Sequence, residues 1–261
     1  MQFSKLLASM ARDGDTWRVE VTDSWLQGRS AFGGFQGAIA LHAMRPHVRE
    51  GLALRVFQMN FVAPIPPGEV RLVSRLLRAG KNTAQVEARI LQGSDTAAVA
   101  VAVFGASRAS RVRVVPERPS IDTSAAFEIP SSPRVLPAFA QHFDVKWLRG
   151  GLPFSGAAVP EASFEIGMRG EEVTTGEHIV AIADMPPPVA LCYLDTAAPG
   201  SSMTWSLEML TDSIAHLPPR GFRLDATLVA AGDGYTSQSV MLWGPGGEAV
   251  ALSRQSMVVF G

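Results

Sequence analysis

The stretch Ile65-Pro66-Pro67-Gly68-Glu69-Val70-Arg71-Leu72 has a counterpart later in the chain, Leu217-Pro218-Pro219-Arg220-Gly221-Phe222-Arg223-Leu224, which lies 152 residues further on. A second pair follows at almost the same offset, because Thr83-Ala84-Gln85 is matched by Thr236-Ser237-Gln238. In both copies a proline pair leads into a segment of alternating hydrophobicity, which is typical of a β-strand. These matches indicate that one structural unit occurs twice in the chain.

Hydrophobic spacing around these landmarks predicts the same kinds of element in both halves. Each half closes with an apolar strand, ending in Phe104-Gly105 or Phe260-Gly261. In the second half, Thr174 and Glu177 form a capping-box pattern, so a helix is expected to begin there and to stop before Pro186-Pro187-Pro188. In the first half we expect, in chain order, a strand at 17–22, a helix at 34–47 and strands at 54–62, 70–77, 84–91 and 97–106. One helix with several antiparallel strands, made twice, is an α+β architecture.

A segment rich in arginine and proline, Ser107 to Arg134, has little periodicity and is predicted to be a linker. We therefore expect a first unit at 1–107, a linker at 108–140 and a second unit at 141–261. A single unit would leave an edge strand exposed, so the two units are expected to cover each other's edges. Residues 1–12 carry apolar side chains at helical spacing and predict a short amphipathic helix.

Composition narrows the classes of function. The chain has 261 residues, a net charge of −1 and a single cysteine, Cys192. A net charge this close to zero creates no overall field that would attract a nucleic acid. A single cysteine cannot form an internal disulfide, so we expect the protein in a reducing cytoplasm. The longest apolar run, 97–106, is too short to span a membrane, and residues 1–12 lack the apolar core of a secretion signal. The five histidines lack metal-binding spacing and no nucleotide-binding motif is present, so neither a metal nor a cofactor is expected.

Three stretches carry a resemblance to a known family. They are Arg29-Ser30-Ala31-Phe32-Gly33-Gly34 at the start of the first helix, Ala183-Asp184 before the three prolines, and Val250-Ala251-Leu252-Ser253-Arg254-Gln255 in the last strand. Together they resemble the acyl-CoA thioesterase II group, the TesB-like thioesterases. The resemblance implies a double hotdog fold, in which two tandem units each wrap an antiparallel sheet around a long helix.

The resemblance also implies an activity, the hydrolysis of a fatty acyl-CoA thioester to free acid and CoA. In that family an aspartate, a serine or threonine and a glutamine hold the attacking water, and no acyl-enzyme forms. Matched onto this sequence, the aspartate is Asp184 and the glutamine is Gln255. The hydroxyl group belongs to Ser202 or Thr204, which we expect on the same strand face. Thr204 stands where the family has an acidic residue.

Independently of the resemblance to the family, the chemistry of these residue types suits the hydrolysis of a thioester. Asp184 is expected at the end of a helix, where the unpaired carbonyl groups disfavour a negative charge and tend to raise the pKa of a carboxyl group. A carboxylate whose pKa is raised can act as general base toward water. Gly33 and Gly34 offer backbone N–H groups at a helix start, which could bind the thioester carbonyl. Alternatively, these glycines only permit close packing, and Gln255 only bonds across the sheet to Gln238 or Thr236.

Two other functions stay open. An enoyl-CoA hydratase-like enzyme of the hotdog class needs an aspartate and histidine pair, but His178 lies six residues before Asp184 and off the same helix face. A non-catalytic acyl-CoA or lipid-binding protein would keep the fold without the chemistry, and the replacement of the family's acidic residue by Thr204 keeps this interpretation open. Double hotdog proteins commonly pair further, so the oligomeric state of the chain stays open, with a homo-oligomer among the alternatives.

Overall fold

The computed structural model describes residues 2–130 and 136–260, and within them one large antiparallel sheet dominates the fold. The helices are α1 (Phe3–Ala8), α2 (Gly33–Met44) and α3 (Gly176–Ala183). The strands are β1 (Ala11–Asp13), β2 (Thr16–Val21), β3 (Leu26–Gln27), β4 (Ser30–Ala31), β5 (Ala53–Phe61), β6 (Gly68–Ala79), β7 (Thr83–Gln92), β8 (Asp95–Gly105), β9 (Phe127–Glu128), β10 (Phe143–Gly150), β11 (Glu161–Met168), β12 (Gly200–Met209), β13 (Phe222–Gly232), β14 (Tyr235–Trp243) and β15 (Ala249–Val259).

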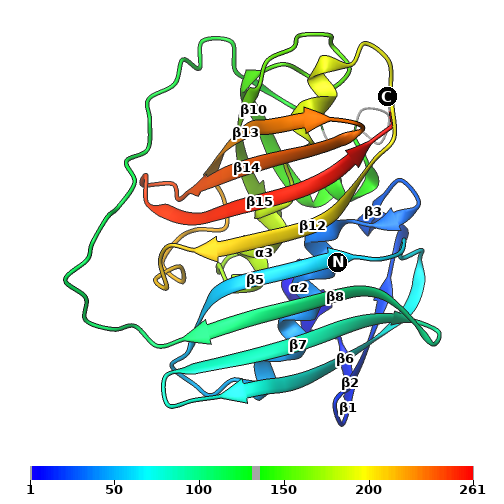
Figure 1. Cartoon of the computed structure of the whole chain (residues 1–261), viewed down its shortest axis with the longest axis vertical. Helices are drawn as coiled ribbons and strands as arrows, with labels where there is room; N and C mark the ends of the chain where they lie inside the picture. The colour runs from blue at the N-terminus through cyan, green and yellow to red at the C-terminus, as the bar shows by residue number, and fades with distance from the viewer. Residues whose placement is uncertain (1, 131–135, 261) are drawn as a thin grey trace.

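The order of strands in the sheet displays the internal repeat. The first half contributes β2-β6-β7-β8-β5 and the second contributes β12-β15-β14-β13-β11, which is the same succession run in reverse. The halves join where β5 pairs with β12, so each covers the other's edge strand (Figure 1). Phe57 and Trp205 pack edge to face across this junction, with ring centroids 5.6 Å apart. The core is therefore continuous from one half to the other.

The helices α2 and α3 pack against each other on one side of the sheet (Figure 1). They run antiparallel, because Gly33 at the start of α2 lies beside Asp184, and Gly176 at the start of α3 lies beside Leu41. Glycines make the close approach possible. A Cβ atom added to Gly37 would lie 2.8 Å from Cγ1 of Val180 and 2.9 Å from Cζ3 of Trp205.

Most predicted elements are present with shifted ends. The strands of the first half lie within two or three residues of the predicted bounds, and the predicted helix 34–47 is α2 followed by a 3₁₀ turn, Arg45–His47. The predicted cap of the second helix is wrong. Thr175 caps α3 and pairs with His178, whereas the hydroxyl of Thr174 donates to the carbonyl of Leu217. Because α3 therefore starts late and ends before the prolines, it has only 8 residues and is not the long helix that was expected.

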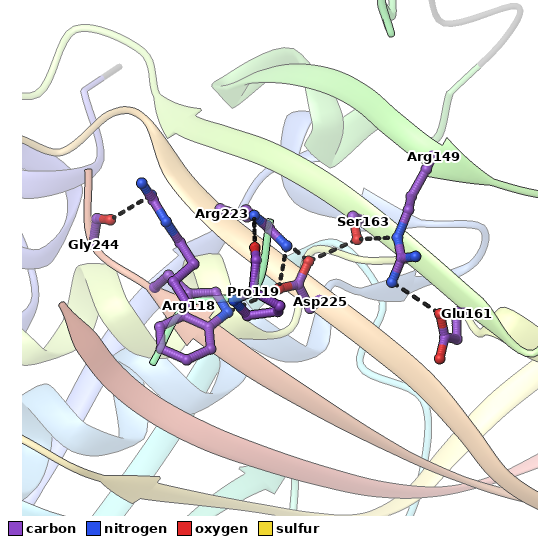
Figure 2. A network of polar contacts seen from close by, with 9 residues as sticks. Arg118, Pro119, Arg149, Glu161, Ser163, Arg223, Asp225 and Gly244 are labelled. Atoms are coloured by element: carbon purple, nitrogen blue, oxygen red, sulfur yellow. Dashed lines mark hydrogen bonds and ion pairs between the residues drawn. The ribbon is translucent and has the colours of Figure 1, made fainter. Parts of the chain in front are cut away.

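The predicted linker is partly built into the second half, while its residues 131–135 lie outside the described residues. Within it, β9 pairs with β10 and extends the sheet. A polar network holds the segment just before β9 against the sheet (Figure 2). Nη1 of Arg223 donates to the carbonyl of Pro119 over 2.8 Å, and Nη1 of Arg118 reaches the carbonyl of Gly244. Asp225 completes the network through an ion pair with Arg223, at 2.9 Å.

Candidate active site

A cavity of about 840 Å³ lies where the start of α2 meets the end of α3. Its walls come from both halves, since the segment before α2 and the end of β5 face α3, β12 and β15. The lining residues are Gln27, Gly28, Arg29, Ser30, Ala31, Gly33, Gln36, Phe61, Val62, Ala63, Pro64, Asp184, Pro186, Pro188, Pro199, Gly200, Ser201, Ser202, Gln255, Met257 and Phe260. Four of the six predicted site residues are therefore brought together here, namely Gly33, Asp184, Ser202 and Gln255.

Asp184 is the C-cap residue of α3, and its side chain turns toward the start of α2. Burial raises the pKa of this carboxyl group to about 7, although hydrogen bonds from the Gln255 side chain and the Gly34 backbone partly oppose the rise. A carboxyl group with this pKa exchanges protons readily at neutral pH, as a general base must. Asp184 thus has the acid strength and the position to take a proton from a molecule in the cavity.

Gln255 is held in one orientation by a chain of hydrogen bonds. Its Nε2 donates to Oδ1 of Asp184, and its Oε1 accepts from Nε2 of Gln238 over 3.4 Å. Oε1 of Gln238 in turn accepts from the backbone N–H of Val189 over 3.0 Å. That N–H can only donate, so it must face the oxygen of the Gln238 amide. The NH₂ group of Gln238 then faces Oε1 of Gln255, and the NH₂ group of Gln255 faces Asp184. The cross-strand bond to Gln238 and the contact with Asp184 therefore exist together, and they are not alternatives.

The sequence predicts Gln238 only as a bonding partner of Gln255. It does not predict that Gln238 fixes the orientation of the Gln255 amide. A signal was present, because Gln238 belongs to the repeated Thr-x-Gln landmark on β14. On adjacent antiparallel strands, Gln238 and Gln255 are direct partners in the register. Side chains of such partners project from the same face of a sheet.

The expectation that Ser202 and Thr204 share a strand face is wrong. The register of β12 against β15 shifts between them, so that Ser202 pairs with Met257 while Thr204 pairs with Ser256. This β-bulge reverses the alternation of side chains along the strand. Ser202 therefore faces the cavity on the same side as Met257, whereas Thr204 is exposed and does not line the cavity.

Gly33 and Gly34 have different surroundings at the start of α2. The backbone N–H of Gly34 donates to the Asp184 carboxylate, so in this structure it is engaged with Asp184. Gly33 lines the cavity, and a Cβ atom added to it would lie 2.7 Å from Oδ2 of Asp184. The first N–H groups of a helix have no partner within the helix and carry partial positive charge. Of the two glycines, Gly33 is the one that lines the cavity.

The opposite junction, between the end of α2 and the start of α3, holds a different set of residues. Arg45 forms an ion pair with Glu177 at 3.0 Å, and the Glu177 side chain is only 7% exposed. Burial alone would raise the pKa of Glu177, but the charge and hydrogen bond of Arg45 bring the net shift below the usual value. This junction is therefore occupied by a compensated ion pair.

The hydratase-like alternative needs a histidine beside Asp184. His178 lies in the first turn of α3, at the other end of the helix, where Nε2 contacts Oε2 of Glu171 at 3.1 Å and Nδ1 contacts Thr175. Both ring nitrogens are used by these partners. His178 therefore does not pair with Asp184.

Cys192 is buried, and its thiol donates to the carbonyl of Val159.

Within residues 2–130 and 136–260, no group of three or more histidine, cysteine or acidic side chains is placed to hold a metal ion. Over the same residues, no helix combines the length and apolar character required to traverse a membrane.

Comparison with solved structures identifies the fold. A protein of unknown function from Alicyclobacillus acidocaldarius, described as having a hot dog fold, superimposes with a TM-score of 0.89 at 18% identity, covering 100% of this chain and 99% of that one. The tesB protein of Mycobacterium avium subs paratuberculosis gives 0.79 at 15% identity, with 100% of both chains covered. An acyl-CoA thioesterase II of Mycobacterium marinum gives 0.74 at 14% identity, with 98% and 97% covered. The chain therefore has the hotdog fold.

Family comparison then gives the class of enzyme. Residues 21–105 match the acyl-CoA thioesterase N-terminal domain, and residues 114–259 match the acyl-CoA thioesterase C-terminal domain. The chain belongs to the acyl-CoA thioesterase family, and it is a thioester hydrolase that acts on acyl-CoA. No curated protein matches the chain in a sequence search.

Proposed function

We propose that the chain hydrolyses fatty acyl-CoA by activating a water molecule between Asp184, Gln255 and Ser202, without an acyl-enzyme. The observation that carries this proposal is the contact of the Gln255 amide with the Asp184 carboxylate, inside a cavity that Ser202 also lines. An amide and a hydroxyl group orient water without adding charge beside the base. Thr204 is left out of the set, because it lies on the exposed side of the β-bulge.

In the proposed reaction, Asp184 takes a proton from the water as the water oxygen bonds to the thioester carbon. The carbonyl oxygen becomes an oxyanion, which the N–H of Gly33 and the partial positive charge at the start of α2 stabilise. When the oxyanion collapses, the carbon–sulfur bond breaks and the sulfur leaves as the CoA thiolate. The proton held by Asp184 goes to that thiolate, so the products are a free acid and CoA.

The exposed end of the cavity suits the nucleotide part of CoA. Gln27, Gly28 and Arg29 line this end, and all three are exposed. A guanidinium group binds phosphate well, and of the arginines that the structure describes, Arg29 is the one that lines the cavity. Among the linker arginines, Arg118 instead contacts the Gly244 carbonyl. We therefore assign Arg29, and not Arg118, to the CoA phosphates.

The proposal includes the organisation of the chain. Residues 1–107 and 141–261 form two hotdog units joined by the linker 108–140, which makes a double hotdog protein. The reversed order of strands and the antiparallel pair α2 and α3 support this arrangement. Further association into homo-oligomers and a cytoplasmic location remain predictions from the sequence.

The test is the release of free thiol from acyl-CoAs ranging from acetyl to palmitoyl. We expect Asp184→Asn to lower kcat by about a hundredfold or more, because a general base accelerates a reaction by roughly 10² to 10⁴. Gln255→Ala should also lower kcat. Asp15→Asn, which makes the same change at an exposed carboxyl group outside the cavity, is the matched control.

Turnover that survives both Asp184→Asn and Gln255→Ala would reject the proposed site. Binding of long acyl-CoAs without any turnover by the wild type would instead favour the non-catalytic alternative.

A further inference from the structure

Gln36 carries a hydrogen-bond acceptor that the fold does not use. This residue lies on α2 one turn after Gly33, is 4% exposed and lines the cavity of Asp184 and Gln255. Its Nε2 donates to the carbonyl of Ala31 over 2.7 Å. Its Oε1 is buried and has no partner among the residues that the structure describes.

The orientation of the Gln36 amide is fixed by this one bond. The carbonyl of Ala31 can only accept, so the NH₂ group of Gln36 must face it, and exchanging the two ends would set two acceptors against each other. The oxygen is therefore the end that has no partner among the described residues. A buried acceptor with no donor is unfavourable, and a ligand with a suitable donor would remove this penalty.

The position of Gln36 indicates which part of the substrate brings the donor. The charged nucleotide of CoA must stay at the exposed end of the cavity, beside Gln27 and Arg29. Buried residues, Gln36 among them, line the inner wall, where the acyl group enters. Gln36 lies about 4.5 Å along the helix axis from Gly33, given a rise of 1.5 Å per residue. A hydrogen-bond donor on the acyl chain, a few carbons beyond the thioester carbonyl, would lie at a similar distance from Gly33.

We propose that Gln36 is a specificity-determining residue whose Oε1 accepts a hydrogen bond from a hydroxyl group on the acyl chain. The preferred substrates are then acyl-CoAs hydroxylated at carbon 2, 3 or 4. This inference rests on the proposed function, and it goes further by naming the class of acyl group. A site built around a buried polar group disfavours the analogue that leaves this group unpaired.

The test compares hydroxylated and unsubstituted acyl-CoAs of equal length in the full-length protein. We expect the wild type to show a kcat/KM roughly tenfold or more higher for at least one hydroxylated substrate. Gln36→Leu should lower kcat/KM for that substrate and raise it for the unsubstituted one, because the unpaired oxygen is gone. Gln36→Glu should retain the preference only in its protonated form, which donates to the carbonyl of Ala31 and still presents an acceptor oxygen.

Gln27→Leu is the matched control, because it makes the same change at the exposed end of the same cavity. It should alter both substrates in equal proportion and leave their ratio as in the wild type. Should Gln36→Leu fail to fold, competition between thioether analogues, with and without the hydroxyl group, measures the same preference by binding to the wild type.

Two outcomes would overturn the inference while the proposed function stands. The first is a wild type with no preference for any hydroxylated substrate. The second is an equal loss on both substrates in Gln36→Leu, which would assign Oε1 to the attacking water or to a pantetheine amide. Failure of the proposed function is distinguishable from both, because it appears as the absence of thiol release from every substrate.

Discussion

At the scale of single residues, the proposed role of Asp184 as general base predicts how the reaction depends on pH. Burial raises the pKa of its carboxyl group to about 7, and only the ionised form can take a proton from water. The ionised fraction grows as the pH rises through 7 and is lost as the pH falls. We therefore expect kcat/KM to increase about tenfold per pH unit below 7 and to level off above about 8. A rate profile between pH 5 and 9 checks this.

The second prediction at this scale concerns Gln238, which touches Gln255 and not the cavity. Without the bond from Nε2 of Gln238, the Gln255 amide is free to turn, so the attacking water is oriented less well. We expect Gln238→Leu to lower kcat by about tenfold, the effect of one hydrogen bond of about 1.4 kcal/mol, with a smaller change in KM. Steady-state kinetics on one acyl-CoA is the measurement.

A matched control comes from the repeat itself. Gln85 is the glutamine of the matching Thr-x-Gln pattern in the first half, but its side chain lies on the exposed face of β7. Gln85→Leu should leave kcat as it is in the wild type. A Gln238→Leu variant with full kcat would show that Gln255 needs no such support.

Residue chemistry explains which parts of the site the sequence could predict. Asp184 and Gln255 stand in recognisable stretches, and the structure brings them into contact. Its place at the end of a helix predicts a raised pKa for Asp184, but burial is the main cause of the rise. Burial depends on chain segments that lie far away in the sequence. The sequence does not predict the unpaired Oε1 of Gln36, because a glutamine is common in helices and its partners depend on the folded surroundings.

At the scale of elements, the close contact of α2 and α3 leads to a prediction of stability. A Cβ atom at position 37 would overlap Val180 and Trp205, both of which are buried. Overpacking of a core costs about 1 to 3 kcal/mol, so Gly37→Ala should lower the free energy of unfolding by this amount. In Gly232→Ala the new methyl group meets nothing within 4 Å, so the stability should be unchanged or slightly higher. Denaturant unfolding of the two variants decides between these outcomes.

Elements also show where sequence patterns fail. Alternating hydrophobicity placed the strands well, because the two faces of the sheet differ in burial along most of its length. The β-bulge between Ser202 and Thr204 has no such signature, since one extra residue on β12 is defined only by its pairing with β15. The choice between Thr174 and Thr175 as helix cap was similarly settled by a distant group, the carbonyl of Leu217.

At the scale of the whole molecule, the two junctions between α2 and α3 have diverged although the halves share one plan. One junction carries the buried carboxyl group of Asp184 beside a cavity, and the other carries the ion pair of Arg45 and Glu177. A carboxylate paired with arginine stays ionised and is a poor proton acceptor at neutral pH, because its pKa is low. Among residues 2–130 and 136–260, the duplicated fold therefore has one candidate active site, and residues of both halves line it.

This dependence predicts what happens when the chain is divided. Gly33 comes from the first half, whereas Asp184 and Gln255 come from the second, so residues 1–107 and residues 108–261 should each lack thioesterase activity. Separation would also expose β5, β12 and the buried faces of α2 and α3, an apolar surface that favours reassociation. Co-expression of the two pieces should therefore yield a complex that releases thiol from acyl-CoA and co-purifies through a tag on either piece. Thiol release by residues 108–261 alone, at the rate of the intact chain, would show that the first half contributes nothing to the reaction.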